Sequence, residues 1–582
     1  MAIPGAGAKR GGQQRSGTGD TGAPVLTLIL SAQAPKPQVP RGIVPRGGIS
    51  YDPQTCATLC WCVPHRRPVM PARTLSLLLV AVSLLSTSPI SRAEDWPQFR
   101  GPNSTGISVS NKRLPVEFSA TQNVTWAHEV GEGIGSPVVA AGRVFTTAMV
   151  GEKGPEQQFV VFAFDAGTGK ELWRHPFPVG AEPLPSVHET NSYASATPVA
   201  DAERVYVYFT RLGLAALDAK TGEMVWKQSL PEPFFIFDWG PGMSPVLHGE
   251  TLFFCQDDDL SPALYAFDRK SGRLLWQDDR GDMAVSYSHP VIAQTKQGPQ
   301  LVVAGTGRLL GYDIESGKRL WASELFCRNI KTTPVVLNDL VYVSVESSGI
   351  SYQWRAQADA NGDGKITRDE VRNSRMNKEA PIPDAFWKKF ERGDVNGDGI
   401  LEGEEIDKAF LDPRNQGGLL AKDVAARAQG EVDASKFDDD QQKEGSFQVV
   451  RGGGSGDVTK TNVLYKKVTR APDHVVSPLV VNGRVWFIKG GGVASCFDAQ
   501  TGKPLWEKKR IGNEGAYLAS PVYGDGKIYI AGQNGFVVVL KDGPELEVLA
   551  KNDMGEAVTG TPAIADGRLY VRSRNKLFCI AP

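Results

Sequence analysis

Two patterns of apolar and polar residues alternate along most of the chain, and each predicts a pair of antiparallel strands. The first begins with Ser/Thr-Pro, continues through a short apolar run and a turn, and ends in an aromatic-rich strand, as in Ser136–Phe145. The second is an apolar strand, an Asp-x-x-Thr/Ser-Gly turn and a strand that ends in tryptophan, as in Phe164–Trp173. Asp favours the start of such a turn and Gly accepts positive φ, so both patterns predict β-hairpins.

The two hairpins together form one repeat of four strands. Its proline recurs mostly at a spacing of roughly 40–45 residues, which is the period of a propeller blade. We therefore expect an all-β protein, an eight-bladed β-propeller of four-stranded antiparallel blades. The eight prolines are Pro137, Pro198, Pro245, Pro290, Pro334, Pro478, Pro521 and Pro562.

The last repeat is incomplete, because the chain ends at Pro582 before a tryptophan-ending strand has formed. The segment Asn123–Val130, in contrast, is a strand-like segment that contains Trp126 but precedes the first repeat and so has no partner strands of its own. We expect this segment to pair with the strand that ends at Ile580. Such pairing closes the ring and removes the exposed sheet edges that favour aggregation.

These motifs make the chain similar to the pyrroloquinoline-quinone-type repeat propellers, a family that includes quinoprotein alcohol dehydrogenases and the outer-membrane-assembly propeller. The resemblance covers roughly residues 95 to 350 and 457 to 582, and Asp95–Pro102 also resembles the start of many bacterial proteins with this repeat. It implies that each motif tryptophan docks against the neighbouring blade. The matching pairs are Asp165 with Trp173, Asp218 with Trp226, Asp268 with Trp276, Asp313 with Trp321, and Asp498 with Trp506.

An insertion of roughly 100 residues interrupts the fifth repeat, where the proline spacing about triples relative to the usual period. It contains two segments, Asp359–Glu370 and Asp394–Glu405, that match the twelve-residue EF-hand loop. Calcium prefers oxygen ligands, Gly364 and Gly399 permit the sharp turn, and a glutamate closes each loop. The predicted ligands of two calcium ions are Asp359, Asn361, Asp363, Lys365 (by its carbonyl), Thr367, Glu370, Asp394, Asn396, Asp398, Ile400 (by its carbonyl), Glu402 and Glu405.

Flanking residues support a pair of such loops. Ile366 and Leu401 occupy position eight, where EF-hand partners join, and Ala385–Arg392 contains an aromatic stripe suited to the helix entering the second loop. The charged and Gln- and Gly-rich segment Asn415–Gly456 is expected to be a linker back to the ring. The runs Asp257–Asp259 and Asp438–Asp440 lack the glycine and the closing glutamate, so we interpret them as solvated loop tips.

The amino-terminal region predicts export. Leu75–Leu85 is too short to span a bilayer, and it lies between Arg73 and Ser91-Arg92-Ala93, as in a secretory signal peptide. We expect a mature chain that begins at Glu94 and translation that begins at Met70. The expected organisation is a structureless leader (1–69), a signal peptide (70–93), the first part of the propeller (94–350), the insertion and linker (351–456) and the second part of the propeller (457–582).

Charge and cysteine usage exclude several other classes. A formal net charge of -1 gives no field for a polyanion, so nucleic acid is not an expected partner. Three cysteines fall in the leader, at positions 56, 60 and 62, without further zinc ligands at suitable spacing. The other four are widely spaced in or beside apolar strands and are expected to be buried thiols: Cys255, Cys327, Cys496 and Cys579.

Three functions remain open from the sequence. The first is a periplasmic or secreted, monomeric, non-catalytic binding or scaffold protein whose propeller face engages a protein or envelope component. The second is a quinone-dependent oxidoreductase; the resemblance implies a vicinal Cys-Cys pair for it, which the sequence lacks, so pyrroloquinoline quinone is not an expected cofactor. The third is hydrolysis by Val187–Tyr193 or Tyr287–Pro290, for which no complete catalytic motif is present. We expect no catalytic residue, and any ligand face to include Val187–Tyr193 and Phe237–Gly240.

Overall fold

A computed structural model describes residues from Glu94 to Pro582, with interruptions. The predicted leader (1–69), signal peptide (70–93) and run Asp438–Asp440 lie outside the described residues. Within 94–582, the positions that are not described are 155, 236–238, 259–260, 282, 284–285, 306, 326–329, 349–360, 362, 364, 374–386, 388–389, 392, 403–404, 406–442, 471–474 and 513–514.

The first four blades follow the predicted repeat, and each begins directly after its Ser/Thr-Pro or His-Pro step. Blade 1 consists of β2 (Val138–Ala140), β3 (Arg143–Val150), β4 (Gln158–Asp165) and β5 (Glu171–Pro178). Blade 2 consists of β6 (Val199–Ala200), β7 (Arg204–Phe209), β8 (Gly213–Asp218) and β9 (Met224–Gln228). Blade 3 consists of β10 (Val246–His248), β11 (Thr251–Gln256), β12 (Ala263–Asp268) and β13 (Leu274–Asp279). Blade 4 consists of β14 (Val291–Thr295), β15 (Gly298–Gly305), β16 (Arg308–Asp313) and β17 (Arg319–Glu324).

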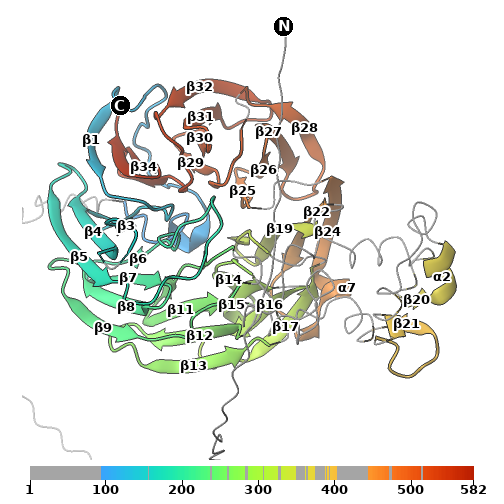
Figure 1. Ribbon diagram of the computed structural model, residues 1–582. Helices are drawn as coiled ribbons and strands as arrows, with labels where there is room; N and C mark the ends of the chain where they lie inside the picture. The colour runs from blue at the N-terminus through green and yellow to red at the C-terminus, as the bar shows by residue number, and fades with distance from the viewer. Residues whose placement is uncertain are drawn as a thin grey trace, which may run out of the picture. The chain divides into compact units, whose positions relative to one another are not determined.

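Four further blades complete the ring in the described part of the chain (Figure 1). Blade 5 consists of β18 (Val335–Leu337), β19 (Leu340–Ser348), β22 (Lys443–Arg451) and β24 (Val463–Arg470). Blade 6 consists of β25 (Leu479–Val481), β26 (Arg484–Lys489), β27 (Val493–Asp498) and β28 (Pro504–Arg510). Blade 7 consists of β29 (Val522–Gly524), β30 (Lys527–Ala531), β31 (Phe536–Lys541) and β32 (Glu547–Asp553). Blade 8 consists of β33 (Ala563–Ala565), β34 (Arg568–Arg572), β35 (Lys576–Ile580) and β1 (Val124–Glu129).

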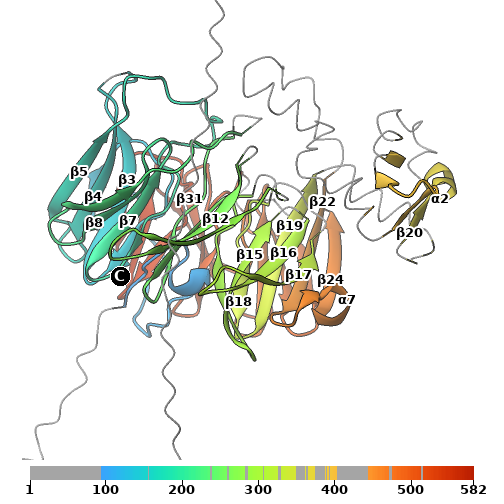
Figure 2. The same ribbon diagram turned by 90° about the horizontal axis from the view of Figure 1, so that it is seen from below.

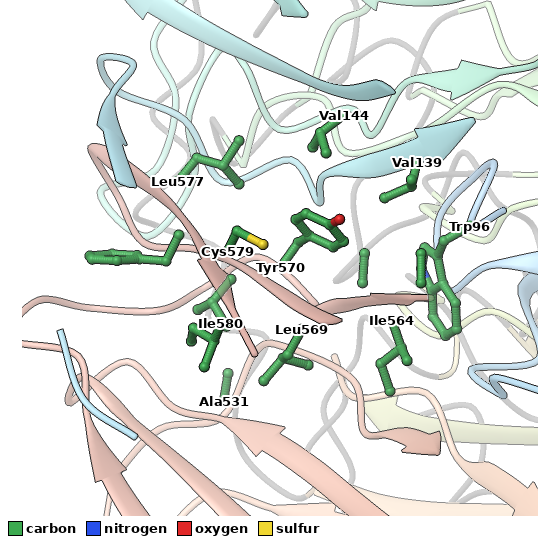
Figure 3. Packing of buried hydrophobic residues seen from close by; sticks show 14 of the residues in the cluster. Trp96, Val139, Val144, Ala531, Ile564, Leu569, Tyr570, Leu577, Cys579 and Ile580 are labelled. Atoms are coloured by element: carbon green, nitrogen blue, oxygen red, sulfur yellow. The ribbon is translucent and has the colours of Figure 1, made fainter. Parts of the chain in front are cut away.

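The ring closes as the sequence predicts. Strand β1 pairs antiparallel with β35, from Val124 opposite Ile580 to Glu129 opposite Lys576. A buried cluster joins this blade to its neighbours and includes Trp96, Tyr570 and Cys579 (Figure 3). The prediction of buried, free thiols is confirmed for Cys255, Cys496 and Cys579, while Cys327 lies outside the described residues.

A belt of hydroxyl groups joins the blades around the centre of the ring. The Ser or Thr before most first strands accepts a hydrogen bond from the backbone N–H of its counterpart in the preceding blade, as Thr197 does from Ser136 (3.0 Å) and Ser520 does from Ser477 (3.1 Å). Blade 4 has His289 at this position, and its Nδ1 lies 2.9 Å from Thr333 Oγ1. Side-chain hydroxyls therefore set the angular spacing of the innermost strands.

Most motif tryptophans dock as the resemblance implies. Trp173 lies on the glycine of the next blade's turn, since a Cβ on Gly222 would come 2.6 Å from its ring. Trp126, Trp173, Trp226 and Trp276 each donate the indole N–H to a backbone carbonyl oxygen in the next blade's turn, at 3.3, 3.2, 3.0 and 2.9 Å.

Trp321 and blade 5 depart from this pattern. Trp321 donates instead to Gln300 Oε1 within its own blade (2.8 Å), because blade 5 lacks the Asp-x-x-Ser-Gly turn that would receive it. In its place β23 (Gly456–Asp457) pairs parallel with β17, and α7 (Thr459–Asn462) follows. Tyr465 performs the docking role for blade 5, donating its hydroxyl to Ala499 O (2.8 Å). Trp506 packs edge-on against Trp486, and its Nε1 has no partner among the described residues.

The insertion leaves the ring between the second and third strands of blade 5. Strands β19 and β22 pair along their whole length, with Ser348 opposite Lys443, so the two ends of the insertion lie side by side (Figure 2). The ring resumes at Lys443 rather than at residue 457, because Lys443–Arg451 is a strand and not a linker. Three short elements are described within the insertion: β20 (Lys365–Thr367), α2 (Arg368–Asn373) and β21 (Ile400–Glu402).

The prediction of a solvated acidic tip at Asp257–Asp259 is wrong for its first two residues, which are fully buried. Asp257 forms a two-pronged ion pair with Arg280 (2.7 and 2.8 Å), which also donates to the Tyr312 hydroxyl. Asp258 accepts backbone N–H groups of Phe234 and Ser261. Because Arg280 lies 23 residues further along the chain, directly after β13, the sequence run alone does not reveal this pairing.

Candidate functional site

The two predicted calcium loops are joined by a short antiparallel strand pair. Strand β20 pairs with β21, with Ile366 directly opposite Leu401, and both side chains are fully buried. Position eight of one loop therefore meets position eight of the other, as the sequence analysis expects of this pair. At the edge of the pair, Lys365 Nζ lies 2.5 Å from Glu402 Oε2.

Both loops contain the same hydrogen-bonded turn. The asparagine at position three accepts the N–H of position five, and the aspartate at position five accepts the N–H of position seven. The four bonds are Asp363 N to Asn361 Oδ1 (2.8 Å), Lys365 N to Asp363 Oδ1 (2.8 Å), Asp398 N to Asn396 Oδ1 (2.9 Å) and Ile400 N to Asp398 Oδ1 (2.8 Å). The match shows that the two segments fold alike over these positions.

The closing glutamates are held by loop N–H groups. Glu370, in α2, accepts the N–H and the hydroxyl of Thr367 through Oε2 (2.9 and 2.8 Å). Glu405 reaches back to the start of its loop, where Oε1 accepts the N–H groups of Val395 and Asn396 (3.2 and 3.3 Å). The second loop is thus closed on itself by the last of its predicted ligands.

The carboxylate of Asp394, at the first position of the second loop, is largely enclosed. Its side chain is 5 % exposed, and its Oδ2 accepts the N–H of Gly399 at 3.0 Å. Its Oδ1 is buried without a partner among the described residues, as is Glu370 Oε1. A buried anionic oxygen without a donor is costly, so each of these atoms is suited to a cation.

Aromatic residues connect the two loops. The backbone N–H of Asp394 donates to Phe390 O (2.9 Å), a helical bond that ends at the first loop position. Phe390 is fully buried and lies 6.0 Å from Trp387 between ring centroids. The guanidinium of Arg368, from the first loop, lies over the Phe390 ring at 4.9 Å. The predicted aromatic stripe therefore packs against the partner loop where it is described.

The remaining predicted ligands lie at the ends of the paired strands or outside the described residues. Asp359 lies outside the described residues, while Thr367 and Glu402 end the paired strands. No three Asp, Glu, His or Cys side chains in the described ranges lie close enough together to hold a metal ion between them. The predicted ligand sets also include an asparagine and a backbone carbonyl in each loop.

The loops expected to form a ligand face line one cavity of about 460 Å³. His188 stacks on Trp239 (4.3 Å between centroids), and Asn191 Nδ2 donates to the carbonyls of Trp239 and Pro241 (2.5 and 3.1 Å). His188 Nδ1 bonds Thr190 Oγ1 (2.8 Å), whereas Ser192 Oγ accepts the Ala194 N–H. Phe237 and Asp238 lie outside the described residues. The cavity is lined by Pro185, Ser186, Val187, Tyr193, Thr210, Glu232, Pro233, Phe234, Phe235, Gly240 and Pro241.

The fold and the repeats define an eight-bladed propeller of the quinoprotein-repeat class. The family model described as outer membrane protein assembly factor BamB matches residues 157–375 and 456–581, more than half of the chain. The chain belongs to this family. Among the described helices, none has the length and apolar character needed to cross a membrane.

Individual relatives fall into two groups. The outer membrane protein assembly factor BamB of Yersinia pestis is 25% identical over 331 residues, which is 56% of this chain and 72% of that protein. The quinohemoprotein alcohol dehydrogenase ADH IIB of Pseudomonas putida is 30% identical over 160 residues, but the match spans 25% of this chain and only 22% of the enzyme. The crystal structure of BamB from Moraxella catarrhalis aligns over 79% of this chain and 99% of its own, with 12% identity and a TM-score of 0.44.

Proposed function

We propose that this chain is a calcium-binding β-propeller of the cell envelope that acts as a non-catalytic scaffold for protein partners. Two calcium ions bind in the insertion, one in each of the loops Asp359–Glu370 and Asp394–Glu405, which form an EF-hand pair. The observation that carries the proposal is the identical turn in both loops, joined by the pairing of Ile366 with Leu401.

Charge and ligand type favour calcium over other cations. The loops offer carboxylate, amide and carbonyl oxygens, and the hard cation Ca²⁺ prefers six to eight such ligands. Asp394 Oδ1 and Glu370 Oε1 are buried oxygens that a bound ion would satisfy. Without an ion, the crowded carboxylates of each loop repel one another.

The scaffold role rests on the family. The match to BamB of Yersinia pestis spans most of that protein, whereas the match to the alcohol dehydrogenase spans about a fifth of the enzyme. This difference in coverage favours a propeller that has protein partners in the cell envelope. We therefore place the protein in the periplasm or outside the cell, and cell fractionation tests this location.

Calorimetric titration of the metal-stripped full chain tests calcium binding. We expect two sites with dissociation constants on the order of 10⁻⁴ to 10⁻³ M, as in extracytoplasmic EF-hand modules. Replacing Glu370 and Glu405 together by Gln removes both closing carboxylates and should weaken binding at least about tenfold. The double variant Glu507→Gln and Glu545→Gln, on exposed ring positions, is the matched control and should bind as the wild type does.

Far-UV circular dichroism of the Glu370→Gln, Glu405→Gln variant shows whether the ring is intact, because the propeller has its own core. Wild-type protein that takes up no calcium at millimolar concentration would contradict the calcium assignment. The scaffold assignment is separate and would be contradicted by a cytoplasmic location.

A further inference from the structure

The cavity of about 460 Å³ lies between two long connections of the ring. One connection runs from β5 to β6 and the other from β9 to β10, so the loops that follow blades 1 and 2 form most of its walls. Three of the lining residues, Pro185, Ser186 and Glu232, are exposed, so the cavity opens to solvent. Its volume is in the range of sites that hold a small ligand or a side chain of a partner.

Aromatic side chains make up much of the cavity wall, and their positions are fixed by contacts. The Tyr193 hydroxyl donates to Pro185 O across the first connection (2.7 Å). Phe235 is buried and stacks on Tyr287, with 5.6 Å between ring centroids. The backbone N–H of the neighbouring Phe234 donates to Asp258 Oδ2 (3.0 Å). The walls are therefore formed before a ligand arrives, and aromatic faces attract cations.

Glu232 is the charged residue of the lining, and part of its carboxylate is available. Its side chain is 40% exposed, and Oε1 lies 3.3 Å from Arg211 Nη2. A charge-assisted hydrogen bond is usually about 2.7–2.9 Å long, so this contact is a weak one. Oε2 has no hydrogen-bond partner among the described residues. The carboxylate can therefore accept a further donor from a ligand.

Arg211 is held mainly by backbone oxygens of the first connection. Its Nη1 donates to Glu182 O (2.6 Å) and its Nη2 to Pro183 O (2.8 Å). These two bonds are much shorter than the contact with Glu232, so they fix the guanidinium to the loop. Arg211 is also outside the cavity lining. It therefore leaves the Glu232 carboxylate only partly neutralised.

Negative charge also acts on the phenol groups at this place. Burial raises the pKa of Tyr208, which lies two residues before the lining residue Thr210, and the charges of Asp258 and Glu232 raise it further. Burial raises the pKa of Tyr193 as well, and there the charges of one carboxylate and one guanidinium oppose each other. The surroundings of the cavity thus favour a cation over an anion.

We propose that this cavity binds an arginine side chain of a partner protein, with the guanidinium on Glu232 and the apolar stem against the aromatic walls. A guanidinium suits both surfaces, because it donates in pairs to a carboxylate and stacks on aromatic faces. The inference rests on the proposed scaffold function, since a protein partner supplies the side chain. It adds the chemistry by which that partner is recognised.

Two small probes of equal shape test the charge requirement. Nα-acetyl-L-arginine methylamide carries the guanidinium, whereas Nα-acetyl-L-citrulline methylamide is its neutral counterpart. In soaked crystals of the full chain, we expect the arginine probe in the cavity, within hydrogen-bonding distance of a Glu232 carboxylate oxygen. By calorimetry it should bind with a dissociation constant on the order of 10⁻³ M, as befits a ligand of so few atoms. The citrulline probe should bind at least about threefold more weakly.

Glu232→Gln removes the charge and keeps the shape of the side chain. We expect this variant to bind the arginine probe at least about threefold more weakly and the citrulline probe as the wild type does. Glu203→Gln, at an exposed glutamate outside the lining, is the matched control and should retain wild-type binding of both probes. Equal affinity of the wild type for the two probes, or unchanged binding by Glu232→Gln, would overturn the proposal.

The wild-type crystals and titrations decide the question even if the Glu232→Gln variant fails to fold. The outcome is also separate from that of the proposed function, which calcium titration and cell fractionation test. An envelope protein that binds two calcium ions but leaves the cavity empty of the arginine probe would overturn this inference alone. Binding of the probe by a cytoplasmic protein would support the cavity as an arginine site and contradict the scaffold role in the envelope.

Discussion

At the scale of single residues, the glycine of each Asp-x-x-Thr/Ser-Gly turn meets two requirements at once. Gly222 has a φ of +75°, and the Trp173 ring of the preceding blade occupies the place that a side chain would need. The turn therefore packs against the tryptophan ring of the preceding blade in addition to connecting two strands. The turn aspartate completes it by accepting backbone N–H groups, which lowers the pKa of Asp218.

Replacing Gly222 by Ala separates these two requirements. Positive φ alone costs a non-glycine residue about 1–2 kcal/mol, and overlap with the Trp173 ring should add about 1–3 kcal/mol. Gly483→Ala is the matched control, because Gly483 has a φ of +74° and nothing within 4 Å of its Cβ position. Urea unfolding should show the larger loss for Gly222→Ala; equal losses would mean that the tryptophan contact adds nothing.

His289 replaces the belt hydroxyl of blade 4, and this makes stability depend on pH. Burial lowers the pKa of His289 from 6.5 to about 4; the Gly242 carbonyl partly opposes this and the Arg100 charge adds to it. The unfolded chain thus takes up a proton at a higher pH than the folded chain. The stability that neutral His289 contributes is present above pH 6.5 and falls by up to about 3 kcal/mol as the pH drops to 4.

His289→Thr restores the residue type of the other belt positions and removes the titrating group. Its free energy of unfolding should fall less than that of the wild type between about pH 7 and about pH 5. His188→Thr, at a partly exposed histidine, should retain the wild-type pH dependence. Identical slopes for the wild type and His289→Thr would show that His289 is not the group responsible.

At the scale of elements, β1 and β23 show how the edges of two blades are paired. Strand β1 covers β35, and β23 covers β17 in blade 4, so two otherwise open edges are paired. The remaining outer strands carry exposed apolar residues such as Leu172, Met224 and Leu274. Closure by β1 matters most, because it also brings Trp126 to the Gly169 turn of blade 1.

Deleting Asn123–Val130 should therefore open the ring. Strand β35 loses its partner and Trp126 no longer joins blades 8 and 1, so we expect soluble aggregates by gel filtration and a lower melting temperature. Trp506→Ala removes a tryptophan that makes no such indole hydrogen bond, and it should leave the chain monomeric. A monomeric, fully folded deletion variant would contradict this closure role.

At the scale of the whole molecule, one ring is combined with an insertion that leaves it through blade 5. The family match covers the ring on both sides of the insertion, from residue 157 to residue 581 with a gap. The sequence contains no two adjacent cysteines. Their absence bears on the alternative of a quinone-dependent oxidoreductase.

Reconstitution with pyrroloquinoline quinone and calcium tests that alternative. We expect neither tight quinone binding nor dye-linked oxidation of alcohols or sugars, because the vicinal cysteines implied by the resemblance are absent. A quinoprotein alcohol dehydrogenase treated in parallel serves as the positive control. Robust turnover by this chain would make it an enzyme and overturn the scaffold proposal.

The sequence by itself determined what is encoded locally and repeated. Turn residues, strand alternation and the prolines before first strands specify eight blades, and the unpartnered strand at Trp126 specifies the closure, since each signal lies within a few residues. The pairing of Ile366 with Leu401 in the insertion could be predicted for the same reason. Tertiary structure decided what depends on distant partners: the burial of Asp257 against Arg280, and the hydrogen bond of Trp321 to Gln300 within its own blade. No local pattern marks these, because the groups that decide them come from other strands and blades.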